Sequence, residues 1–103
     1  MRTDKRIEKI IEEATVDTYN EWEELAGWDT ILTDNISTPQ KCKINDEAAI
    51  LIGISSNDKA VYAKVRFEKL KKNISVPIEH VDLKDKSQAV YIKAYKKGFS
   101  DQF

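Results

Sequence analysis

The chain has 103 residues, of which 41% are apolar and 34% are charged. This length and balance predict one soluble domain over residues 1–103 and exclude a disordered or collagen-like chain. The single cysteine excludes an intrachain disulfide and favours the cytoplasm, and no segment approaches the ~20 apolar residues of a membrane span. The net charge of −1 is unevenly divided: residues 1–58 carry 6 basic and 13 acidic side chains, whereas residues 59–103 carry 11 basic and 5 acidic ones.

Helical spacing dominates the first third of the chain. Apolar residues recur there at steps of three and four, which predicts one long amphipathic helix over residues 4–26. We expect Thr3 to cap the start of this helix and Gly27 to end it. Helical spacing then resumes and predicts a short second helix over residues 28–35, which stops before Pro39.

Beyond residue 39 the apolar period changes from 3.6 to 2, which is typical of strands. From Val61 to Phe67 the odd-numbered positions are apolar, and we expect them to face inward. About four short strands are predicted, separated by polar turns at residues 45–46, 55–58 and 71–73. Such a meander has to hide its edges, so we expect a small antiparallel, barrel-like (SH3-like) sheet.

A further helix is predicted near the C-terminus, over residues 86–97. Helices at both ends of a compact sheet make the fold class α+β. The two tryptophans, Trp22 and Trp28, fall in the helical N-terminal segment, and we expect both to pack where it meets the sheet.

The sequence contains no recognisable catalytic motif. Its three glycines are far apart, so no glycine-rich loop is available to bind a phosphate. One histidine and one cysteine cannot supply the four ligands of a structural zinc site. We expect His80 to be a surface residue and Cys42 to be a small inward-facing apolar residue. The sequence therefore predicts a protein that is not an enzyme.

The acidic stretch from residue 8 to residue 24 is the most distinctive feature, with seven carboxylates against one lysine. Four of them fall at spacings of four, four and three, and so share one ridge of the predicted helix: Glu13, Asp17, Glu21 and Glu24. Oxygen ligands gathered in this way suit Ca²⁺, which takes 6–8 of them. The alternatives are that lysines of the second half neutralise the ridge, or that it is a solvated face.

The basic side chains cluster at the turn near residues 69–72 and along the predicted last helix. Lysines near a helix C-terminus are favoured by its dipole, and an isoelectric point of about 5.8 is low for a nucleic-acid-binding domain. We therefore expect these lysines to be solvated and expect no nucleic-acid partner.

The segment V-D-T-Y-N-E at residues 16–21, followed by Gly27-Trp28, Leu32, Asp34 and Pro39, resembles the cyanobacterial calcium-binding protein (CcbP) family. More loosely, residues 52–54 and 74–78 are similar to strands of that family. The resemblance implies a small helix-plus-barrel domain that binds calcium as a buffer or sensor. Carried over by position, it implies the ligands Asp17, Glu21 and Asp34, with Glu24 close to them by helical geometry.

This chain departs from the family in two respects. Family members are strongly acidic, whereas this chain is nearly neutral, and their aromatic, acidic C-terminal segment is replaced here by the lysine-rich residues 91–97. Fewer carboxylates predict weaker calcium affinity. A second hypothesis therefore stays open: a metal-free interaction or inhibitor module that recognises a protein partner through its charge-divided surface.

Overall fold

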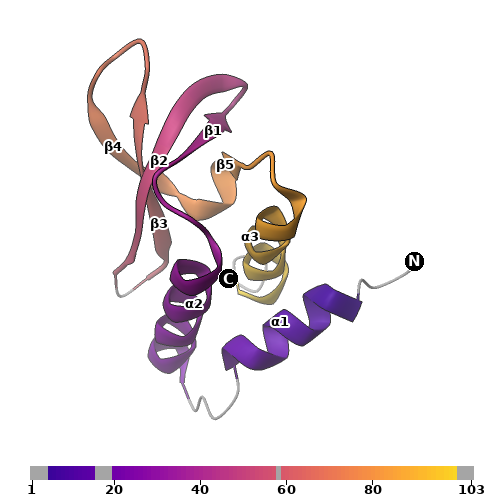
Figure 1. Cartoon of the computed structure of the whole chain (residues 1–103). Helices are drawn as coiled ribbons and strands as arrows, with labels where there is room; N and C mark the ends of the chain where they lie inside the picture. The colour runs from indigo at the N-terminus through magenta and orange to yellow at the C-terminus, as the bar shows by residue number, and fades with distance from the viewer. Residues whose placement is uncertain (1–4, 16–19, 58, 100–103) are drawn as a thin grey trace.

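A computed structural model describes residues 5–15, 20–57 and 59–99 of the chain (Figure 1). In chain order the elements are α1 (Lys5–Thr15), α2 (Glu21–Asn35), β1 (Gln40–Ile44), β2 (Glu47–Ser56), β3 (Val61–Phe67), β4 (Asn73–Pro77), the 3-10 helix η1 (Ile78–His80), β5 (Val81–Asp82) and α3 (Lys86–Gly98). The α+β class and the C-terminal helix are confirmed. None of the helices in these described segments is long and apolar enough to cross a membrane.

The prediction of one helix over residues 4–26 is wrong, because two helices divide this segment. α1 ends at Thr15, and α2 begins after Asn20, whose side-chain Oδ1 accepts a hydrogen bond from the Glu23 N–H at 2.9 Å. The expected cap at Thr3 lies outside the described residues.

Gly27 does not end a helix but lies inside α2, which corrects its expected role. A Cβ atom at this position would collide with the carbonyl oxygen of Ala14, a buried residue of α1. The glycine therefore allows the two helices to cross with their backbones in close contact. Because α2 continues through Gly27, the short helix expected over residues 28–35 is the second half of a 15-residue helix.

The five strands form one antiparallel sheet in the order β4-β3-β2-β1-β5. The expected barrel is wrong, because the edge strands β4 and β5 do not pair with each other and the sheet stays open. β5 is only two residues long and pairs with Lys43 and Ile44 at the end of β1, which leaves it too short to close a barrel. The predicted turn at residues 45–46 is confirmed, since Asn45 and Asp46 both have positive φ, as a two-residue hairpin requires.

The core lies between the helices and one face of the sheet. The four apolar side chains of β3 at odd-numbered positions are buried as predicted, and Cys42 is buried as well. Trp28 is fully buried and meets the ring of Tyr95 from α3 edge to face, with ring centroids 5.6 Å apart. The Tyr95 hydroxyl accepts a hydrogen bond from the Val61 N–H at 3.1 Å, which ties α3 to the start of β3.

Trp22 does not share this environment. Its side chain is 70% exposed, so the expectation that both tryptophans pack against the sheet is wrong for Trp22. Figure 1 shows the three helices gathered at one end of the molecule, while the turn between β3 and β4 projects at the opposite end. His80 is exposed in η1, as expected of a surface histidine.

Candidate metal centre

The carboxylates between residues 10 and 40 have no basic residue among them. Between residues 10 and 40 the sequence holds eight Asp and Glu residues and neither lysine nor arginine. In the described part of this stretch, α2 carries most of them. α2 therefore carries four partly or fully exposed carboxylates and no positive charge: Glu23, Glu24, Asp29 and Asp34.

The first turn of α2 holds one group of predicted ligands. Glu24 lies there with a half-buried side chain, and its neighbour Glu23 is also half-buried. Glu21 is the first residue of the helix, but its side chain and the whole of Asp17 lie outside the described residues.

Asp34 lies at the other end of α2, in its last turn, with an exposed side chain. It is ten residues from Glu24, which corresponds to about 15 Å along the helix axis at a rise of 1.5 Å per residue. The structure therefore places these two predicted ligands too far apart to coordinate the same ion. Within the described segments, no group of three His, Cys, Asp or Glu side chains could hold a metal.

The helix dipole distinguishes the two ends of α2. Its N-terminal end is partly positive, so it stabilises the carboxylates of the first turn but opposes an added cation. Its C-terminal end is partly negative, the last carbonyl oxygens of a helix lack intrahelical partners, and no basic residue lies in the last turn of α2. The Asp34 end of the helix is thus the electrostatically favoured place for a cation.

The chain just after α2 is held in place by α3. The Gln88 side-chain oxygen accepts hydrogen bonds from the Ser37 N–H at 2.9 Å and from Gln40 Nε2 at 2.6 Å. Its amide nitrogen donates to the Asp85 carboxylate at 3.1 Å. Hydrogen bonds from Ser87 and Gln88 lower the pKa of Asp85, which keeps a second carboxylate ionised near this end of α2.

Asp85 did not figure among the predicted ligands. The sequence did contain a signal for Asp85, because aspartate is a favoured helix N-cap residue and Asp85 is the N-cap of α3 in the sequence D-K-S-Q.

Asp29, in the middle of α2, has a structural role. Its two carboxylate oxygens accept hydrogen bonds from the hydroxyls of Thr33 at 3.1 Å and Ser56 at 2.6 Å, which joins α2 to the end of β2.

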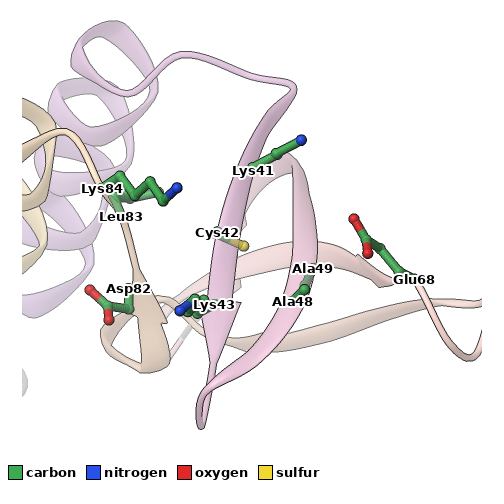
Figure 2. Close-up of a pocket in the computed structure, with 9 residues that line it drawn as sticks. All are labelled: Lys41, Cys42, Lys43, Ala48, Ala49, Glu68, Asp82, Leu83 and Lys84. Atoms are coloured by element: carbon green, nitrogen blue, oxygen red, sulfur yellow. The ribbon is translucent and has the colours of Figure 1, made fainter.

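A pocket of about 380 Å³ lies beside β1 and is lined mainly by β1, β2 and the segment that runs from β5 towards α3 (Figure 2). Figure 2 shows Cys42 near the middle of the view, on β1 between Lys41 and Lys43, with Leu83 and Lys84 on one side of the strand and Ala49 and Glu68 on the other. The lining residues are Lys41, Cys42, Lys43, Ala48, Ala49, Glu68, Asp82, Leu83 and Lys84. Burial, and to a lesser extent the Asp82 charge, raise the pKa of the Cys42 thiol, so it stays protonated and is a poor metal ligand. With three lysines against two carboxylates, this pocket is unsuited to a divalent cation.

Comparison with known proteins identifies the class. Residues 8–96 match the sequence profile of the Calci_bind_CcbP family, which is described as calcium binding. The chain therefore belongs to this family of calcium-binding proteins, and the resemblance seen in the sequence is confirmed.

Two solved structures are similar to this one. The crystal structure of CcbP from Anabaena superposes with a TM-score of 0.75 at 19% sequence identity, covering 95% of this chain and 94% of that one. A calcium binding protein in its calcium-binding form superposes with a TM-score of 0.79 at 19% identity, covering 100% and 98%. At this identity the two superpositions show a shared fold. No curated protein matches the chain by sequence.

Proposed function

We propose that this protein binds calcium as a non-enzymatic buffer or sensor, through carboxylates at the two ends of α2. The observation that carries the proposal is the stretch of eight carboxylates with no lysine or arginine, which lies within the family match. A calcium-binding structure among the fold relatives supports the choice of ion. The family assignment likewise supports a role without catalysis.

The proposed ligands fall into two groups. Glu24, in the first turn of α2, belongs to the first group, and we add Asp17 and Glu21 to it because the family resemblance implies them as ligands. Asp34 anchors the second, where the partly negative end of the helix and Asp85 add to the attraction for a cation. Backbone carbonyls are ordinary calcium ligands, so Asp34 does not need a cluster of acids around it.

Calorimetric titration of the metal-free chain with Ca²⁺ tests this proposal. We expect weak binding, with a dissociation constant of about 10⁻⁴ M, because the carboxylates are few. Since Ca²⁺ binds the folded state, a concentration of 100 times that constant should stabilise the fold by about 2.7 kcal/mol and raise the melting temperature by several degrees. Mg²⁺ should do less at equal concentration, because it gives up its waters reluctantly.

The variants Asp17→Asn and Asp34→Asn separate the two groups. If both ends of α2 bind calcium, each variant should remove part of the bound calcium and leave the rest. Glu47→Gln is the matched control, because it also removes one exposed carboxylate but lies at the start of β2. If the melting temperature of the wild-type chain does not rise in millimolar Ca²⁺, the proposal is wrong.

Hydrogen exchange with and without Ca²⁺ then separates a buffer from a sensor. A sensor should change protection across α1 and α2, because it must alter a surface to signal. A buffer should slow exchange only at its ligands.

A further inference from the structure

Three large apolar side chains are exposed in the described residues: Trp22 at 70%, Leu70 at 64% and Ile74 at 37%. A single exposed apolar residue is ordinary on a protein surface. The two most exposed ones, however, lie in surroundings of opposite charge.

Trp22 lies in the first turn of α2 beside Glu23 and Glu24, in the part of the sequence that has no lysine or arginine. We call Trp22, Glu23 and Glu24 the acidic end. Tryptophan is among the residues that contribute most to protein interfaces, because it buries a large area at a small loss of side-chain entropy.

Leu70 lies in the turn between β3 and β4, among Lys69, Lys71 and Lys72, all of them exposed. We call residues 69–72 the lysine tip. Ile74 follows on β4, an edge strand of the open sheet, and extends the exposed apolar surface. The lysine tip therefore combines exposed apolar area with positive charge. The acidic end combines exposed apolar area with negative charge.

The lysine tip and the acidic end are complementary in charge, but within one molecule they cannot contact each other. Figure 1 places the start of α2 and the β3–β4 turn at opposite ends of a molecule that is 41 Å long. We propose that the lysine tip of one copy docks on the acidic end of a second copy, with Leu70 packed against Trp22. A net charge of −1 supports this, because it gives little overall repulsion between copies.

The geometry dictates the kind of assembly. Different surfaces meet on the two partners, so the contact is heterologous, and it extends head to tail into short chains of copies. Both surfaces are small, so the interface falls below the roughly 1,200 Å² of a stable complex and association is weak. Attraction between exposed charges is screened by salt, so chains should shorten as ionic strength rises.

Sedimentation velocity on the full chain, at rising protein concentration and in a calcium chelator, tests the proposal independently of calcium binding. The wild type should gain average mass with concentration. Raising the salt from about 0.05 M to about 0.5 M should weaken association about fivefold or more, because the Debye length shortens from over 10 Å to a few Å.

Two single variants give the decisive comparison. Trp22→Ser removes one surface and Leu70→Ser the other, and both side chains are exposed, so the fold is retained. Each variant alone should stay monomeric. An equimolar mixture should form a dimer and nothing larger, because only one intact acidic end and one intact lysine tip then remain to meet.

A matched pair of lysine variants isolates the charge. Lys71→Ser should weaken association severalfold, whereas Lys93→Ser, which removes the same charge from the exposed surface of α3, should leave it unchanged. A wild type that stays monomeric at every concentration overturns the proposal. So does a Leu70→Ser chain that still associates by itself, because that result indicates a symmetric contact such as pairing of β4 edges.

Discussion

Trp22 and Trp28 lie six residues apart on α2, yet one is 70% exposed and the other is fully buried. Six residues turn a helix by about 240°, so the two indoles point to different sides. Trp28 lies on the side that carries Leu25 and Leu32, both buried, whereas Trp22 faces solvent among carboxylates.

The two sides of α2 therefore have different roles. Its inner side is covered by α1 at Gly27 and by Tyr95 of α3, and it holds the helical layer against the sheet. Its outer side and its two ends carry the negative charges that we propose to bind calcium and a second copy of the chain. Changes on the inner side should alter stability, and changes on the outer side should alter binding.

The largest expected effect separates the two tryptophans directly. Trp28→Ala should lower the free energy of unfolding by about 3–5 kcal/mol, because it leaves a large cavity in a packed core. Trp22→Ala should change it by no more than about 0.5 kcal/mol, as for other exposed side chains. Urea unfolding followed by circular dichroism measures both. Equal losses would break the distinction between the two sides.

A smaller effect is expected at the crossing of the helices. Gly27→Ala places a Cβ atom against the Ala14 carbonyl and should destabilise the fold by about 1–3 kcal/mol, despite the better helix propensity of alanine. Gly53→Ala is the matched control, because no atom lies within 4 Å of a Cβ there. The two melting temperatures give the comparison. A Gly27→Ala protein as stable as the wild type would show that the helices do not cross so closely.

The smallest effect concerns the start of α2. Asn20→Ala removes the side chain that accepts the Glu23 N–H and should cost about 1 kcal/mol of stability. Asn20→Asp should keep that stability, since a carboxylate accepts the same bond and suits the partly positive end of the helix. Chemical unfolding of both variants measures the difference, and equal stability of Asn20→Ala and the wild type would contradict the cap.

The family could be predicted because the motif that indicates it is local. The motif around Gly27, Trp28 and Asp34 is a run of sequence, and it identified the family correctly. The grouping of its acids could not be predicted in the same way. One continuous helix would place Asp17 and Glu24 on the same ridge. The structure instead has a separate helix that begins at Glu21, and Asp34 lies about 15 Å further along its axis than Glu24.

The break between α1 and α2 carried a signal that periodicity does not capture. Asn20 followed by Glu23 is a helix-capping pattern, and it lies inside a stretch whose apolar residues keep a helical period. Periodicity measures which residues face the core, and two helices packed on the same core can share a period. The cap, and not the period, marks where one helix stops and the next starts.

Local patterns in the sequence were enough to predict the α+β class, the inward face of β3, the tight turn at residues 45–46 and the membership of a calcium-binding family. These follow from side-chain alternation, turn chemistry and motif spacing, which act over a few neighbouring residues. Tertiary structure alone decided that the sheet stays open, that Gly27 is a crossing point and that Trp28 rather than Trp22 is buried. The physical reason is that each of these depends on which distant segment arrives against a surface, and local patterns specify a surface without specifying what covers it.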